Sequence, residues 1–328
     1  MNRNVLFSKL FTAAIAMIML TACSSGENEG AEESAGNSSA NTVDTKFGEV
    51  DVPEEPQRVV ALGWGDAETA LALGVEPVGA SDWLDFGGDG VGPWMEDSYE
   101  ESPEIIGTME PDYEQIAALQ PDLILDTKSS GDEERYDRLS DIATTVGVPE
   151  GADNYLTSME DQVQMIATAL HREDEGEALL QEVDTAFEQA AEENPQFEGQ
   201  TITVAAYDAN GFGAYVEGDS RIDFVRRLGF ETKDEIEALA EDSFYVSLSD
   251  EQLELLDADL TVVLPIGVDR SQITDNQLYQ QIPSVADGRS VVLDSDLSNA
   301  FSTGTVPSIL WAIDNVTPEL AEVLEDEE

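Results

Sequence analysis

Aromatic side chains gather in the loops beside the strands that the sequence predicts. In an open parallel sheet the ligand lies beyond the carboxyl ends of the strands, so rings at these positions can line a cleft. Flat rings suit a large, partly apolar ligand. For any single ring, packing in a hydrophobic core is an equally good interpretation. The candidate ligand-contacting rings are Trp64, Trp83, Trp94, Tyr207, Tyr245 and Phe301.

Two cations occupy comparable positions. Lys128 closely follows the strand-like run 123–126, and Arg221 opens a predicted helix after a Gly-Asp turn. Because the chain has only 14 Lys and Arg against 71 Asp and Glu, a cation beside a predicted cleft is informative. Both side chains suit bonds to anionic ligand oxygens, and a local ion pair with a neighbouring acid is the alternative.

The formal net charge of −57 argues against some partners. A surface of this kind repels phosphate backbones, so nucleic acid is not an expected partner. It also repels itself unless salt screens it. We therefore hypothesise a saline habitat, since the Debye length is about 3 Å at roughly 1 M salt.

Histidine and cysteine, which often carry catalysis or bind transition metals, are scarce. The chain has one histidine, His171, and one cysteine, Cys23. A histidine cluster for a transition metal and an internal disulfide are therefore not expected. The chain also lacks a nucleophile-elbow motif and a phosphate-binding loop. The sequence predicts neither an enzyme nor a resident cofactor or metal.

The first residues resemble an export signal. A basic start and a short apolar run over 10–20 lead to Leu-Thr-Ala-Cys, which ends at Cys23 and resembles the bacterial lipoprotein signal. We expect a signal peptide over 1–22, lipidation of Cys23 and a flexible tether over 23–46 that is rich in small and polar residues. On this interpretation the protein is exported, and its lipid anchors it to the outer face of the cytoplasmic membrane.

The rest of the chain alternates between strand-like and helix-like segments, which favours parallel sheets. Apolar runs at 58–63, 123–126, 201–206 and 260–264 are typical of buried strands. We predict an α/β fold with an N-terminal lobe over 47–157 and a C-terminal lobe over 199–328. A helical connection over 158–198 contains a single long interlobe helix.

The two lobes repeat one sequence pattern. The segment 114–123 begins with Glu-Gln, has a leucine at its sixth position and ends in Asp-Leu, and the segment 251–260 does the same. Each copy predicts a helix, a turn and a buried strand. Units of this kind also look alike in unrelated α/β proteins.

Several segments carry a family resemblance: 56–62, 72–79, 114–125, the predicted interlobe helix and 249–264. In this order, behind a lipoprotein cysteine, they resemble the class III (cluster A) substrate-binding proteins of bacterial ABC importers. That group serves ferric siderophores, haem and cobalamin. The resemblance implies two Rossmann-like lobes, with central parallel sheets, and a ligand in the cleft between them.

The resemblance also implies a docking role for Glu114 and Glu251, each of which would hold an arginine on one of two permease subunits. The alternative is that both are solvated acids favoured by a helix start.

The implied function is an extracytoplasmic lipoprotein that captures a ferric siderophore and delivers it to an ABC permease dimer with a cytoplasmic ATPase. Because cations are few, a hydroxamate chelate is favoured over a highly anionic catecholate. The first alternative is the same fold binding haem or cobalamin, and an alternative of another class is a cell-surface sensor, adhesion protein or enzyme. We expect a monomer.

Overall fold

The computed structural model describes residues 41–240 and 243–325. Cys23, the predicted signal peptide and most of the predicted tether lie outside these residues. The described chain begins with an antiparallel hairpin of β1 (Thr42–Thr45) and β2 (Gly48–Asp51). The predicted end of the tether at residue 46 is therefore wrong, because Val43 is buried and β1 is paired.

The N-terminal lobe is built on a five-stranded parallel sheet with the order β5-β4-β3-β6-β7. Its strands are β3 (Val59–Ala61), β4 (Gly79–Ser81), β5 (Glu104–Ile106), β6 (Leu123–Leu125) and β7 (Thr144–Val146). Its helices are α1 (Asp66–Ala72), α2 (Tyr113–Ala118), α3 (Glu133–Ser140) and the short 3-10 helix η1 (Pro93–Met95).

Helices cover both faces of this sheet, which is why its central strands β3 and β6 are continuous apolar runs. Ala61 and Leu125 pack on the side of α1, whereas Val60 and Ile124 pack with α2 and α3. The carboxyl ends of the strands then lead into loops at one edge of the sheet.

Two helices lead from the first lobe to the second. The first, α4 (Met159–Leu170), starts at Ser158, whose hydroxyl accepts a hydrogen bond from the Asp161 amide. His171 ends this helix in a left-handed conformation. The second, α5 (Glu173–Glu193), is followed by the 3-10 helix η2 (Pro195–Phe197). The predicted helical connection therefore consists of two helices, and the longer one, α5, is its long helix.

The C-terminal lobe contains a six-stranded sheet with the order β11-β9-β8-β12-β13, and β10 also pairs with β8. Its strands are β8 (Thr201–Asp208), β9 (Gly211–Tyr215), β10 (Glu231–Thr232), β11 (Tyr245–Ser247), β12 (Leu260–Pro265) and β13 (Ser290–Val292). The two-lobed α/β prediction is confirmed, but this sheet is mixed. A connection as short as Ala209-Asn210 can join only antiparallel neighbours, so β9 departs from the predicted parallel arrangement. β11 pairs antiparallel with β9 and therefore runs in the same direction as β8.

Short helices surround this second sheet. They are α6 (Ser220–Arg227), α7 (Asp234–Glu237), α8 (Arg270–Thr274), α9 (Pro283–Ala286), α10 (Ser295–Thr303) and the 3-10 helices η3 (Asp250–Leu256) and η4 (Tyr279–Gln281). The repeated sequence pattern therefore forms an α-helix in the first lobe and a 3-10 helix in the second.

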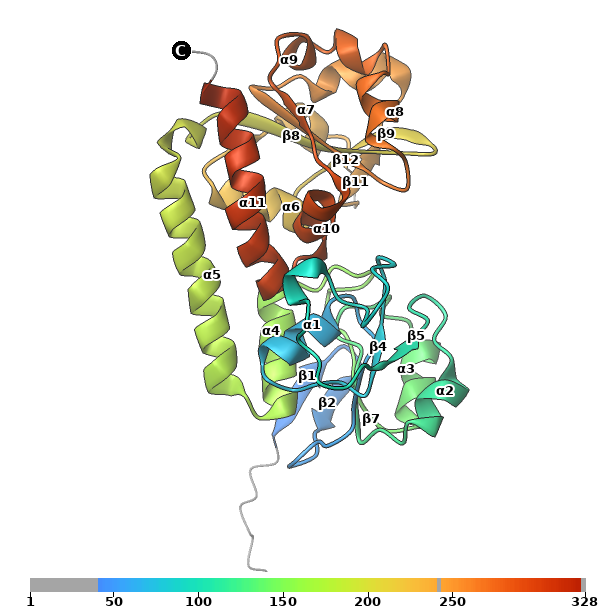
Figure 1. The fold of residues 1–328 in the computed structure, drawn as a ribbon. Coiled ribbons are helices and arrows are strands. Elements are labelled where there is room, and N and C mark those ends of the chain that lie inside the picture. Colours follow the sequence, from blue (N-terminus) through green and yellow to red (C-terminus); the bar gives the residue numbers. More distant parts are fainter. Residues whose placement is uncertain (1–40, 241–242, 326–328) are drawn as a thin grey trace, which may run out of the picture. The chain divides into compact units, whose positions relative to one another are not determined.

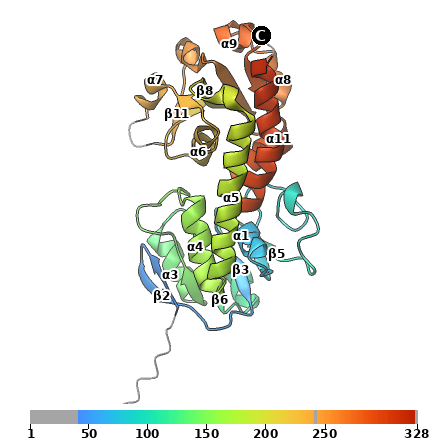
Figure 2. The ribbon, with the colours of Figure 1, turned by 90° about the vertical axis from the view of Figure 1, so that its left-hand side faces the viewer.

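A second long helix, α11 (Val306–Glu325), follows α10 in the C-terminal lobe, whereas α5 is the predicted interlobe helix. It packs along α5 and also contacts α1 and η1 of the first lobe (Figures 1 and 2). Ile313, Val316 and Leu320 form its buried face, and Trp311 packs partly buried against the same core. α11 thus adds a packing contact between the lobes to the chain connection through α5.

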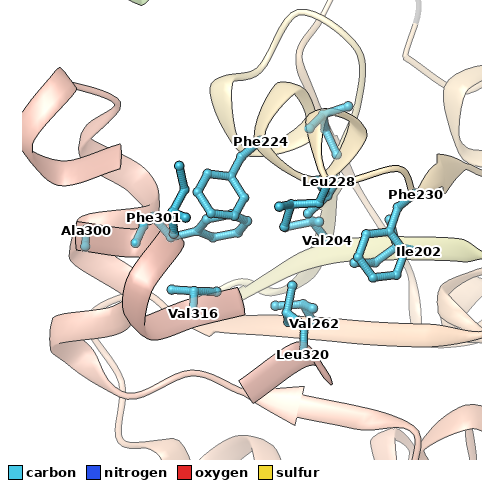
Figure 3. Close-up of a cluster of buried hydrophobic side chains, with 14 of the residues drawn as sticks. Ile202, Val204, Phe224, Leu228, Phe230, Val262, Ala300, Phe301, Val316 and Leu320 are labelled. Carbon is cyan, nitrogen blue, oxygen red and sulfur yellow. The ribbon is translucent and has the colours of Figure 1, made fainter. Parts of the chain in front are cut away.

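The core of the second lobe joins α6, α10 and α11 to the sheet (Figure 3). Phe224 and Phe301 meet edge to face there, with their ring centroids 5.1 Å apart. Phe301 is only 3% exposed. The structure therefore places this candidate ligand contact in the hydrophobic core.

Candidate functional site

A cavity of about 560 Å³ is lined by residues of both lobes. The first lobe contributes the loops after β3, β4 and β6 and the segment 154–160, which leads into α4. The second lobe contributes α6, the end of α10 and Phe244. Of the eight candidate ligand-binding residues, Trp64, Trp83, Lys128 and Arg221 line this cavity.

Three stacked aromatic rings form one wall of the cavity. Trp64 lies between Trp83, at a centroid distance of 4.3 Å, and Tyr155, at 3.9 Å. The indole nitrogen of Trp64 is buried and has no hydrogen-bond partner among the described residues. The wall therefore offers the cavity a broad apolar surface.

Lys128 is a buried amine at the edge of the same wall. It is 8% exposed, and no hydrogen bond or ion pair joins its Nζ to another described residue. Burial lowers the pKa of its amine to about 8, opposed by the carboxylates of Asp219 and Asp66, while nearby Arg221 lowers it further. An anionic ligand oxygen would supply the partner that this amine lacks.

Arg221 faces Lys128 from the second lobe and is already held in place. Its Nη1 lies 2.7 Å from Asp219 Oδ2, its Nε donates to Ser302 Oγ at 3.3 Å, and its guanidinium stacks over the Tyr215 ring at 4.0 Å. Arg221 therefore forms a local ion pair with Asp219 and also lines the cavity. Its orientation is fixed before any ligand arrives.

The buried carboxylate of Asp66 ties together the loops that carry Trp64 and Lys128. Asp66 Oδ2 accepts from the amides of Gly63 (3.0 Å) and Thr127 (2.9 Å), and Oδ1 accepts from the side chains of Thr127 (2.5 Å) and Gln162 (2.7 Å). Gln162 also donates to the carbonyl of Trp64 at 2.9 Å. Burial raises the pKa of Asp66 to about 6, although these hydrogen bonds oppose the shift.

The other four candidates lie away from the cavity. Trp94 donates its indole N–H to Glu68 at 3.0 Å and approaches Trp311 at 5.9 Å. Tyr207 packs against Phe212 in the core, and Phe301 is in the core as described above. Tyr245 packs beside Tyr215 and so supports the ring over which Arg221 stacks.

The sequence analysis missed several lining residues, chiefly in the segment 154–158. Asn154 and Tyr155 both have left-handed backbones, with φ of 58° and 67°. This conformation turns the loop so that the Tyr155 ring meets Trp64. The signal available in the sequence was weak: Asp153-Asn154 is a turn-forming pair without periodicity.

Glu114 and Glu251 occupy equivalent places in the two lobes. Each lies exposed in the first turn of its helix, after the capping residues Asp112 and Ser249 respectively. No salt bridge joins either glutamate to a described residue. Their role in docking stays a prediction.

The repeated segments 114–123 and 251–260 each place an aspartate that bonds to the start of the neighbouring strand. Asp122 accepts from the amides of Gln57 and Arg58, before β3, and Asp259 accepts from the amide of Thr201, at the start of β8. In both lobes the aspartate thus fastens the central strand next to its own.

Two further properties hold for the described ranges, 41–240 and 243–325. Within them, no helix combines the length and the apolar character needed to cross a membrane. No group of three or more His, Cys, Asp or Glu side chains is arranged to hold a metal ion there.

Comparison with known proteins places the chain in a family. It is 28% identical to "Probable siderophore-binding lipoprotein YfiY" of Bacillus subtilis over 88% of this chain and 90% of the relative. It is 26% identical to "Fe(3+)-citrate-binding protein YfmC" of the same organism, over 91% and 92%. The crystal structure of Streptococcus pneumoniae PiaA in complex with ferrichrome aligns with a TM-score of 0.74 and 25% identity, over 88% of this chain and 99% of PiaA. The family model described as "Periplasmic binding protein" matches residues 59–297, and the chain therefore belongs to this family.

Proposed function

We propose that the protein is the substrate-binding lipoprotein of an ABC importer and that it captures a ferric siderophore, of hydroxamate type, in the cavity. The observation that carries the proposal is the pairing of the aromatic wall with the unpartnered amine of Lys128. Rings supply area for a bulky chelate, and a few fixed polar groups set its orientation. The cavity volume lies within the roughly 300–1,000 Å³ typical of small-molecule sites.

The relatives support this ligand class. Their names refer to a siderophore and to Fe(3+)-citrate, and the similar solved structure holds ferrichrome. The protein changes the location of its ligand and makes or breaks no covalent bond. Iron enters as part of the transported chelate, not as a resident cofactor.

Delivery requires a permease. Glu114 and Glu251 are exposed carboxylates, one on each lobe, which suits a twofold pair of permease subunits that each present an arginine. A cytoplasmic ATPase would drive release into the permease. One monomer would dock at a time.

Retention outside the cell requires an anchor. Lipidation of Cys23 would hold the folded body, which begins by residue 42, on a tether at the outer face of the cytoplasmic membrane.

The test is a titration of tryptophan fluorescence with ferrichrome, ferric ferrioxamine B, ferric citrate, haem and cobalamin. We expect saturable quenching by a ferric hydroxamate with a Kd of about 1 μM or tighter, which is about −8 kcal/mol. The iron-free siderophore is the chemical control. Trp64→Phe should remove most of the signal, whereas the matched variant Trp311→Phe, outside the cavity, should retain it. If only haem or cobalamin gave saturable quenching, the proposal of a ferric siderophore would be wrong.

A further inference from the structure

A turn of the second lobe, Gly304–Thr305, is seated in the first lobe. The hydroxyl of Thr305 lies 2.5 Å from Glu68 Oε2, although the two residues are 237 positions apart. Glu68 is 3% exposed and Thr305 is fully buried. We call this contact, together with Gly65, the interlobe joint.

The backbones of the two lobes meet closely at the joint. Gly65 has φ +80°, and a Cβ atom there would lie 2.5 Å from the methyl carbon of Thr305. Gly304 ends α10 with φ +70°, and a Cβ atom at this position would lie 3.6 Å from Lys128 Nζ. The turn therefore fits a socket that has no room for a side chain at Gly65.

Glu68 is held by neutral donors only. It accepts from the Gly92 amide at 3.0 Å, from Trp94 Nε1 at 3.0 Å and from Thr305. No salt bridge joins it to a cation within the described residues. A buried carboxylate is costly unless such donors satisfy it, so loss of one donor should destabilise the arrangement.

The joint lies directly beside the ligand cavity. Thr305 immediately precedes α11, and the residues just before the turn, Ser302 and Thr303, line the cavity. Lys128 lines it from the first lobe and reaches the same turn. A shift of the joint would therefore change the distance between Lys128 and the facing residue Arg221.

We propose that Glu68 and Thr305 are positioning residues that fix the relative orientation of the two lobes and thereby hold Lys128 opposite Arg221. Without the Thr305 donor, the lobes sample a wider range of orientations before ligand binds. The joint is a property of the ligand-free chain, so it does not depend on which chelate is bound.

The test measures the distance between the lobes by pulsed electron spin resonance on the ligand-free full chain. Spin labels are attached at Ala117→Cys and Glu254→Cys, both exposed, after Cys23→Ser removes the natural thiol. Thr305→Val removes the hydroxyl and keeps the shape. We expect the fraction of molecules outside the main distance peak to rise about tenfold, as expected for a hydrogen bond to a buried charge.

Two matched variants separate positioning from loss of stability. Thr305→Ser restores the hydroxyl and should restore the narrow distribution. Thr201→Val removes a similar bond, from Thr201 Oγ1 to Asp259 at 2.7 Å, inside the second lobe alone, and should leave the distribution unchanged. A distribution in Thr305→Val that equals the parent's overturns the proposal.

A measurement on the unmodified chain covers the case in which Thr305→Val fails to fold. The amides of Gly87 and Gly92 lie in one loop, and each donates to a carboxylate. Exposed Gly87 donates to half-buried Asp82 at 2.8 Å, and buried Gly92 donates to Glu68 in the joint. A fixed joint predicts hydrogen exchange at least about tenfold slower at Gly92 than at Gly87. Equal exchange rates would refute a fixed joint.

Discussion

Replacement of Lys128 by methionine should stabilise the ligand-free protein. The amine is buried without a hydrogen-bonding partner, and its pKa falls from 10.5 to about 8. Since the unfolded chain holds this proton more tightly, the charged amine costs folding about 3 kcal/mol below pH 8. Lys128→Met keeps the unbranched shape of the side chain, one atom shorter, and removes that cost. At pH 7 the variant should therefore melt roughly 5 °C higher.

The sign of the pH dependence distinguishes this explanation from ordinary repacking. As pH rises through 8, Lys128 loses its proton in the folded parent while the unfolded chain still retains it. The penalty should fall to about 1 kcal/mol at pH 10, and the gap between variant and parent should shrink accordingly. Thermal unfolding of both proteins at pH 7 and pH 10 measures this gap.

The matched control is Lys46→Met. Lys46 is partly exposed and forms an ion pair with Asp153 at 2.6 Å, so its replacement should not raise the melting temperature. A Lys128→Met variant less stable than its parent at pH 7, or a gap that stays the same at pH 10, would refute the reasoning.

The same variant should bind a ferric chelate at least about tenfold more weakly, because the donor to its oxygens is lost. Stability and binding would then change in opposite directions.

Three further predictions test other parts of the site. In the parent, Asp66 lowers the stability as pH rises from about 4 to 6, because its raised pKa makes the buried charge costly. Asp66→Asn should remove this loss, and denaturant unfolding across the same pH range measures it. Trp64→Ala should weaken chelate binding at nearly unchanged stability, whereas Phe301→Ala should cost about 3–5 kcal/mol of unfolding free energy. If Phe301→Ala weakened binding more and Trp64→Ala destabilised the fold more, the two assigned roles would be exchanged. Glu114→Arg combined with Glu251→Arg should abolish uptake of radioactive iron by cells while chelate affinity stays normal, and full uptake would remove the docking role.

The sequence was sufficient to predict the positions that follow strands. Apolar runs at β3 and β6 are bounded by turn residues, so the loops after them could be located, and with them Trp64 and Lys128. The rule that ligands lie beyond the carboxyl ends of parallel strands then placed both residues at the cavity.

The sequence was insufficient where a role depends on burial or on long-range contacts. Asp66 and Glu68 are two among 71 acidic residues, and only the fold shows that both are buried and bonded to distant loops. Phe301 and Trp64 are both aromatic residues that follow a strand, yet Phe301 lies on the face of α10 that packs in the core. Tyr155 reaches the cavity through a left-handed backbone that no periodic pattern encodes.

The most direct test of the central claim is a crystal structure of the protein grown with ferric ferrioxamine B or ferrichrome. The account predicts that the chelate lies in the cavity, with one face against the rings of Trp64 and Trp83 and an oxygen bonded to Lys128 Nζ. A chelate bound elsewhere, or a cavity that stays without chelate at saturating concentration, would contradict it.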